Sequence, residues 1–161
     1  FTGLRRQEAM KLQWDQVNLK AKTLTVIDTK NRNPLTLPFG TFILKLLKDR
    51  KSKATDSPFV FPGSGKTGHL VESKYQTAQV TKESGIKFCL HDLRRVFINA
   101  AEGLDISSFA VKQLVNHSVN GDVTAGYMVS DPERLRKPME RIETHLLRLC
   151  RKDVAKIVSI K

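Results

Sequence analysis

The chain has 161 residues, of which 40% are hydrophobic, and its 28 lysines and arginines outnumber 16 acidic residues to give a formal net charge of +12. This length suits one domain around a single core, and the positive excess favours a polyanionic partner, most often nucleic acid. A membrane surface is the less favoured partner, because the sequence has no signal peptide and no apolar run approaching about 18 residues. Two cysteines are too few for a disulfide framework, and Cys89, within an apolar run, is expected to be buried and reduced.

The opening residues predict a turn that leads into a helix. Residues 2–14 place Arg5 in the first helical turn, where backbone N–H groups without helical partners favour an anion. Glu8 follows three residues later, so an ion pair with Arg5 is expected, and this pair can orient the guanidinium. Because the chain has no initiator Met and reaches this helix almost at once, we expect it to be a fragment of a longer protein.

A β-hairpin and a basic helix are expected next. Alternating, β-branched residues predict a strand over residues 23–28 and a return strand over 35–38, with a turn cluster between them. Lys30 therefore lies at the tip or shoulder of the hairpin, where a solvated lysine is the ordinary expectation and contact with a groove is the alternative. Apolar residues at helical spacing over 39–53 predict an amphipathic helix with a charged outer face.

A Gly-rich loop and a polar helix follow. The run Gly63-Ser64-Gly65-Lys66-Thr67 resembles the end of a nucleotide-binding P-loop. The first glycine that a P-loop requires is replaced by Val60, so we reject nucleotide binding and expect a flexible loop. Residues 72–84 then predict a polar helix that ends at Gly85.

The stretch 89–101 carries the most informative pattern in the chain. Read as a helix, it places four apolar residues at the spacing of a buried stripe, namely Leu93, Val96, Phe97 and Ala100. The opposite face then carries His91, Arg94, Arg95 and Ile98. An imidazole and a guanidinium one turn apart suit an oxyanion such as a phosphodiester, because arginine offers a planar fork of donors and histidine can transfer a proton. For this pair alone, a solvated surface helix is the simpler interpretation.

The C-terminal third is expected to be helical. We predict a helix over residues 106–116 with Asp105 as its N-cap, a short helical segment over 122–129 that carries Tyr127, and a further helix after Pro138. The last helix has a narrow apolar stripe of Met139, Ile142, Leu146 and Leu149. So narrow a stripe fits docking into a groove of its own domain or of a neighbour. The fold class expected from these elements is mainly α with a small antiparallel sheet (α+β).

Four motifs follow one another along the chain. They are Thr2-Gly3-Leu4-Arg5-x-x-Glu8, a hairpin lysine, His91-x-Leu93-Arg94-Arg95, and a helix-end histidine ten residues before a tyrosine. In this order and at these separations the chain resembles the tyrosine recombinase (phage integrase) family from about Thr2 to Ile142. The stretch 124–136 is most similar to prophage and satellite-phage integrases. The resemblance implies the family's catalytic-domain fold over residues 1–161, with residues 138–161 as a tail that packs in cis or on a neighbour.

The same resemblance assigns six catalytic positions: Arg5, Lys30, His91, Arg94, His117 and Tyr127. It implies that the two arginines and His117 stabilise charge on a phosphodiester. Tyr127 is then the nucleophile, with His91 as its proton acceptor, and Lys30 protonates the leaving 5′-oxygen. The implied product is a 3′-phosphotyrosine link, which retains the bond energy for resealing without ATP. No cofactor is implied, and four histidines without a close carboxylate cluster or paired cysteines argue against a metal nuclease.

The family resemblance also implies partners. These are double-stranded DNA at attachment sites, a homotetramer on two paired sites, and accessory DNA-bending and directionality proteins, with a monomer expected for this fragment alone. The expected setting is the bacterial cytoplasm and nucleoid, where the protein integrates or excises a mobile element. We expect the helices that precede the first motif in the family, and the separate arm that grips the other side of the DNA, to lie outside this fragment. Two other functions stay open: a type IB topoisomerase, and a basic DNA-binding module without catalysis.

Overall fold

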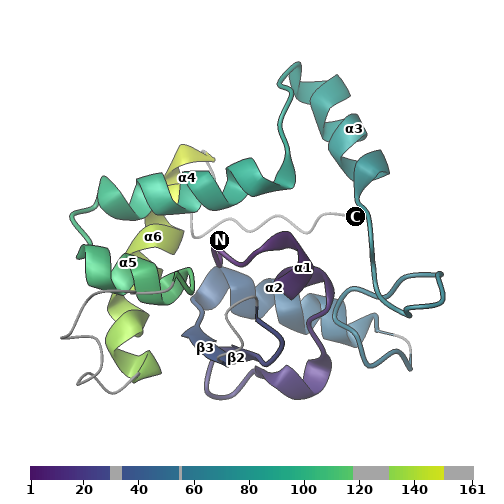
Figure 1. Ribbon diagram of the computed structural model, residues 1–161, viewed down its shortest axis with the longest axis horizontal. Coiled ribbons are helices and arrows are strands. Elements are labelled where there is room, and N and C mark those ends of the chain that lie inside the picture. The colour runs from purple at the N-terminus through teal and green to yellow at the C-terminus, as the bar shows by residue number, and fades with distance from the viewer. Residues whose placement is uncertain (30–33, 55, 118–130, 151–161) are drawn as a thin grey trace.

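The computed structural model describes residues 1–29, 34–54, 56–117 and 131–150, which form a mainly helical fold with one small antiparallel sheet (Figure 1). The predicted α+β class is therefore confirmed. Within the described ranges, no helix is both long enough and apolar enough to cross a membrane.

The N-terminal part builds a three-stranded antiparallel sheet after a short helix. Its elements are α1 (Arg6–Met10), the 3-10 turn η1 (Trp14–Gln16), β1 (Val17–Asn18), β2 (Thr23–Val26) and β3 (Leu35–Pro38). In the β2–β3 pair, Leu24 lies opposite Leu37, and both are buried because residues at matching positions of paired strands point to the same face. The predicted hairpin is confirmed, while its tip, with Lys30, lies outside the described residues.

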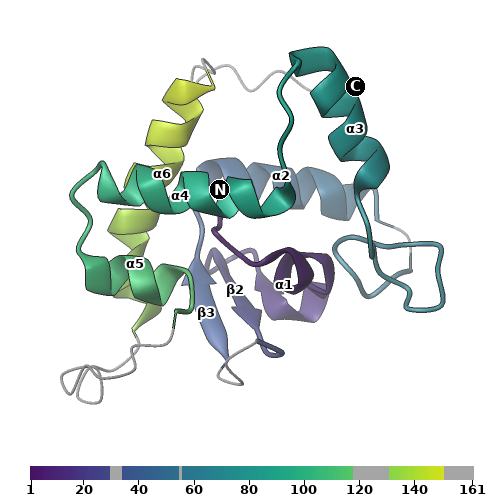
Figure 2. The same ribbon diagram turned by 45° about the horizontal axis from the view of Figure 1, so that its top comes forward.

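Helices make up most of the remaining described chain. They are α2 (Thr41–Ser52), α3 (Lys74–Ser84), α4 (Leu90–Glu102), α5 (Ser108–Leu114), the 3-10 turn η3 (Pro132–Leu135) and α6 (Arg136–Leu149). As predicted, α3 ends at Gly85, which adopts the left-handed conformation of a helix C-cap with φ of +72°. No residue of α3 is buried, and the helix stands away from the others in both ribbon views (Figures 1 and 2).

The core lies where α4 packs on α6 (Figure 2), and η3 packs on β3. Its largest fully buried side chains include Leu37, Phe39, Phe97, Leu114, Met139 and Ile142. Three of the four residues predicted to form the stripe of the last helix are buried, so α6 docks on its own domain in this structure. The prediction for Leu149 was wrong: it is 63% exposed, because it occupies the last position of α6, beyond the packed turns.

The inward face of α4 differs from the predicted one. Leu93 and Val96 are 55% and 48% exposed, whereas Arg94 is only 5% exposed. The buried residues of this helix are Arg94, Phe97, Ala100 and Ala101. The prediction that Arg94 faces away from the core was therefore wrong. Periodicity counts a charged residue as exposed, but here the guanidinium finds backbone acceptors inside the fold.

Two local predictions at helix starts were also wrong. Cys89 is exposed at the N-cap of α4, where its backbone N–H donates to the Asp92 carboxylate at 2.8 Å. The N-cap of α5 is Ser107, whose hydroxyl accepts a hydrogen bond from the Ala110 N–H at 3.3 Å, and not Asp105. Asp105 instead has a left-handed backbone with φ of +53° in the connection from α4 to α5.

A buried carboxylate on α6 caps the start of α2. The two carboxylate oxygens of Glu143 accept hydrogen bonds from the backbone N–H groups of Phe42 at 3.1 Å and Ile43 at 3.3 Å. These N–H groups lack helical acceptors, and a negative charge is favoured at a helix N-terminus. Gly40 leaves room for this contact, since a Cβ there would lie 2.2 Å from Glu143 Oε1. The capping bond joins two helices that are distant in the sequence.

Candidate active site

Arg5 is held at the start of α1 by the acid three residues later. Its Nη1 donates to Glu8 Oε1 at 2.9 Å, and its backbone N–H donates to Glu8 Oε2 at 2.8 Å. This confirms the ion pair predicted from the sequence. Glu8 is buried, so the carboxylate has a fixed position, and it orients the guanidinium rather than forming a solvated surface pair.

Arg94 is held by two backbone carbonyls from distant parts of the chain. Its Nη1 donates to Gly3 O at 2.6 Å, and its Nη2 donates to Val115 O. Gly3 has a left-handed φ of +66°, and a Cβ at this position would lie 2.7 Å from Phe97 Cδ1. Glycine is required here because the loop must approach α4 closely enough to reach Arg94.

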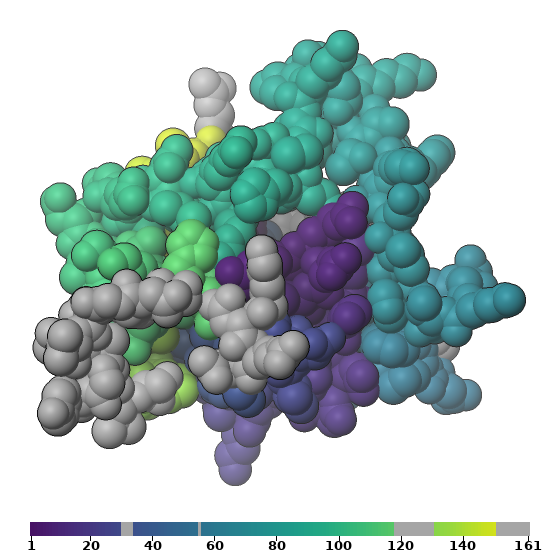
Figure 3. Space-filling model, in the orientation of Figure 1, coloured from purple at the N-terminus to yellow at the C-terminus, as the bar shows by residue number. Residues whose placement is uncertain are grey.

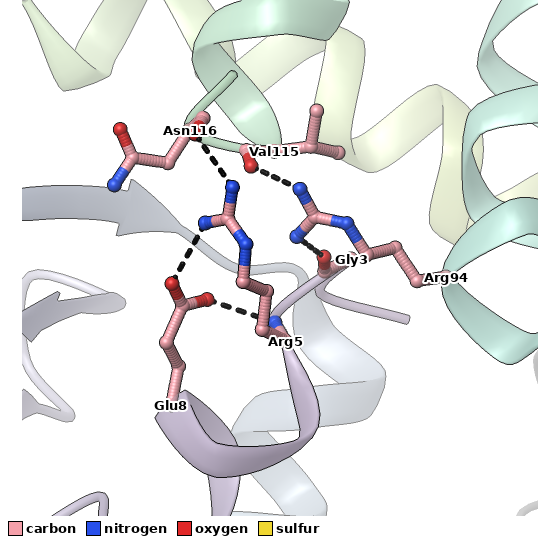
Figure 4. Close-up of polar contacts among 6 residues, drawn as sticks. All are labelled: Gly3, Arg5, Glu8, Arg94, Val115 and Asn116. Carbon is pink, nitrogen blue, oxygen red and sulfur yellow. Dashed lines mark hydrogen bonds and ion pairs between the residues drawn. The ribbon is translucent and has the colours of Figure 1, made fainter. Parts of the chain in front are cut away.

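The two guanidiniums lie side by side at the C-terminal end of α5 (Figure 4). Arg5 Nη2 donates to Asn116 O at 3.1 Å, and Arg94 donates to the preceding carbonyl, Val115 O. A guanidinium has five N–H donors. The hydrogen bonds above use one N–H on Nη1 and one on Nη2 of each arginine, so each guanidinium has further N–H groups. The structure therefore brings together two arginines that are predicted from separate motifs, and both retain donors for an oxyanion.

The electrostatics of the pair favour an anion. Burial lowers the pKa of Arg94 from its ordinary value, and the positive charge of Arg5 lowers it further, while Glu8 opposes part of this effect. Among the described residues, no carboxylate forms an ion pair with Arg94, whose hydrogen-bond acceptors, Gly3 O and Val115 O, are neutral carbonyls. A buried positive charge is costly unless it is compensated. An oxyanion placed between the arginines supplies that compensation.

His117 belongs to the same cluster. It follows Asn116 directly at the end of α5, and its pKa is lowered first by partial desolvation and then by the charges of Arg94 and Arg5. A lowered pKa keeps the imidazole neutral near pH 7, when one ring nitrogen carries a hydrogen and the other accepts. His117 is thus suited to donate a hydrogen bond to an anion that the arginines hold.

The other predicted site residues have different outcomes. His91 lies exposed in the first turn of α4, one turn before Arg94. Lys30 and Tyr127 lie outside the described residues. Within the described ranges, no group of three or more His, Cys, Asp or Glu residues is placed to hold a metal ion. The described cluster therefore consists of Arg5, Arg94 and His117.

Sequence reasoning missed the backbone groups that hold this cluster. The carbonyls of Gly3, Val115 and Asn116 are acceptors that no side-chain motif reveals. The only local signals are a glycine before the first helix and an asparagine at a helix end, both residue types that tolerate positive φ. In the space-filling view, the purple N-terminal segment lies beside the teal-green surface of α4 (Figure 3).

Comparison with solved structures defines the class of fold. The structure matches an integrase from mycobacterium phage Brujita with a TM-score of 0.63 at 20% identity, over 88% of this chain and 47% of that one. It matches the XerA recombinase with a TM-score of 0.60 at 18% identity, over 95% and 55% of the two chains. It also matches the XerH site-specific recombinase bound to its difH substrate, with a TM-score of 0.60 at 18% identity over 91% and 42%. The fold is that of tyrosine recombinase catalytic domains.

The family follows from the sequence comparisons. The model of the phage integrase family matches residues 1–134, and the chain belongs to this family. In an alignment of 153 residues that covers 91% of this chain, the chain is 30% identical to prophage integrase IntF of Escherichia coli (strain K12). It spans 32% of the length of that relative. The resemblance predicted from the four motifs is confirmed.

Proposed function

We propose that Arg5, Arg94 and His117 bind the scissile phosphate of double-stranded DNA, and that the protein is a site-specific recombinase that integrates or excises a mobile element. The observation that carries the proposal is the buried guanidinium of Arg94, which contacts carbonyl oxygens beside a second guanidinium. An in-line attack on a phosphodiester increases the negative charge on its non-bridging oxygens. Fixed donors at those oxygens stabilise the transition state without a metal.

The chemistry is a transesterification at phosphorus. The phenolic oxygen of Tyr127 attacks the phosphorus, the bond to the 5′-oxygen breaks, and a 3′-phosphotyrosine link and a 5′-hydroxyl form. A tyrosine phenol ordinarily has a pKa of about 10, so attack requires a proton acceptor, for which we assign His91. Lys30 gives a proton to the leaving 5′-oxygen. Attack by the 5′-hydroxyl of another strand reverses these steps and reseals the DNA.

The charge of the chain supports DNA as the partner. The excess of 28 basic over 16 acidic residues favours contacts to phosphates on both sides of the scissile bond. Recombination needs two DNA sites, so the proposed assembly is a homotetramer on paired sites, with the chain monomeric in the absence of DNA. Accessory DNA-bending and directionality proteins complete the proposed assembly.

A substrate with a sulfur leaving group tests the function and the role of Lys30 together. The attachment-site DNA carries a 5′-bridging phosphorothiolate at the scissile position, and covalent protein–DNA adduct is measured on denaturing gels. We expect Lys30→Ala to cleave ordinary DNA about two to four decades more slowly than the wild type. It should recover on the phosphorothiolate, because the sulfur leaves without protonation. The matched control is Arg32→Ala, in the same hairpin, which should cleave both substrates like the wild type.

The outcomes separate the alternatives. If the intact wild-type protein binds both DNAs but forms no adduct with either, the recombinase proposal fails and a DNA-binding module without catalysis is left. Relaxation of plasmids that lack any attachment site would instead favour a topoisomerase. If the wild type forms the adduct and Lys30→Ala stays inactive on the phosphorothiolate, only the acid role of Lys30 is contradicted.

A further inference from the structure

The C-terminal end of α5 is closed by a Schellman motif. The His117 N–H donates to Lys112 O at 2.9 Å, and the Asn116 N–H donates to Gln113 O at 3.2 Å, which is the pair of bonds that defines this motif. The motif requires a left-handed residue at its turn, and Asn116 supplies it with φ of +48°. Glycine is the usual residue at such a turn, and asparagine is the common substitute.

This turn aims two carbonyls at the two arginines. Val115 O accepts from Arg94, and Asn116 O accepts from Arg5 at 3.1 Å (Figure 4). Carbonyls in the last turn of a helix have no helical donor, and the negative end of the helix dipole favours cations. The places of both guanidiniums therefore depend on the direction of two consecutive peptide groups. The backbone of residue 116 sets that direction.

We propose that Asn116 is a positioning residue whose left-handed backbone sets the spacing of the Arg5 and Arg94 guanidiniums and the orientation of His117. The proposal rests on the function proposed above, in which this cluster binds the scissile phosphate. A side chain that resists positive φ would rotate the peptide groups on both sides of residue 116. Both acceptors would then move together, and His117, the next residue, would move with them.

Two variants that differ strongly in their tolerance of positive φ test the proposal. Asn116→Gly removes the side chain and keeps the turn, whereas Asn116→Val opposes it, because β-branched residues rarely adopt positive φ. Both variants lose the Asn116 side chain, so the cleavage rates of the two are compared with each other at saturating DNA. We expect Asn116→Val to be about tenfold to a hundredfold slower than Asn116→Gly, since small misplacements of catalytic groups have effects of that size. DNA affinity should change by less than about twofold in both.

A matched pair elsewhere controls for backbone strain. Lys22, in the turn between β1 and β2, is also left-handed, with φ of +54°. Lys22→Gly and Lys22→Val lose the same charge and differ in the same way as the pair at position 116. At both positions, the Val variant should have a lower melting temperature than the Gly variant. The two Lys22 variants should nevertheless cleave saturating DNA at equal rates. If Asn116→Val fails to fold, Asn116→Ala replaces it in the comparison.

The ionisation of His117 gives a readout that does not need cleavage. Its NMR resonance is assigned by its loss in His117→Gln. In the wild type, desolvation and the two arginines hold the pKa of His117 below its ordinary value. Asn116→Val should raise this pKa towards the ordinary value, because the guanidiniums leave their places, and Asn116→Gly should not.

The two proposals fail in different ways. If Asn116→Val changes neither the His117 pKa nor the cleavage rate, or if Asn116→Gly is as impaired as Asn116→Val, the positioning role is wrong. If the wild type forms no adduct with DNA and Asn116→Val still raises the pKa, the recombinase function fails and the positioning role stands.

Discussion

Replacing Tyr127 with phenylalanine is expected to abolish the covalent protein–DNA adduct. Phenylalanine has the same ring but lacks the hydroxyl that attacks phosphorus, so no 3′-phosphotyrosine link can form. DNA binding should be unchanged, because the net charge of +12 is unaltered. The measurement is a denaturing gel with labelled attachment-site DNA that carries a nick beside the scissile phosphate, so that the adduct accumulates.

The chain supplies its own control for this experiment. It has two tyrosines, and the other one, Tyr75, is 78% exposed on α3. Tyr75→Phe removes the same atom and should form adduct like the wild type. Adduct formation by Tyr127→Phe, or its loss in Tyr75→Phe, would contradict the assignment of the nucleophile.

Arg94→Ala is expected to slow cleavage by about two to three decades, which corresponds to about 3–4 kcal/mol in the barrier. The guanidinium is buried and fixed by two carbonyls, so its remaining donors can meet a phosphate without reorganisation. Arg94→Lys should also be slow, because an ammonium is a point charge that cannot span Gly3 O and Val115 O while facing the phosphate. Single-turnover cleavage at saturating DNA measures the effect, and circular dichroism checks the fold.

The adjacent arginine is the matched control. Arg95 is exposed and pairs with Asp92 at 3.1 Å on the surface of α4, an interaction of little consequence for stability. Arg95→Ala changes the net charge by the same amount as Arg94→Ala and should cleave within about twofold of the wild type at saturating DNA. Equal defects in the two variants would mean that general charge, rather than the fixed position of Arg94, drives cleavage.

Local sequence signals predicted much of the fold. The hairpin follows from alternation and turn residues, the end of α3 follows from Gly85, and the Arg5–Glu8 pair follows from its spacing. These features depend on interactions between residues that are close in sequence, so a short stretch of sequence is enough to predict them. The motif order likewise identified the family without any tertiary information.

The failures share one physical cause. Arg94 can be buried because the carbonyls of Gly3 and Val115 accept hydrogen bonds from its guanidinium. The periodicity of a helix cannot predict hydrogen-bond partners that lie elsewhere in the chain. Leu93 and Val96 are exposed as a consequence, since the helix presents only one face to the core. Glu143 is another example, because its acceptor role depends on the start of α2 lying against α6. The positions of buried polar groups depend on tertiary hydrogen bonds, which cannot be predicted from local sequence patterns.

The central claim is that Arg5 and Arg94 act on one phosphate, and a double-mutant cycle measures this directly. Single-turnover cleavage is measured for Arg5→Ala, Arg94→Ala and the double variant at saturating DNA. If the two guanidiniums act as one unit, the double variant should be no more than a few-fold slower than the slower single variant, because residues in one network are strongly non-additive. If the two rate losses simply multiply, the arginines act independently and the claim of a shared phosphate site is contradicted.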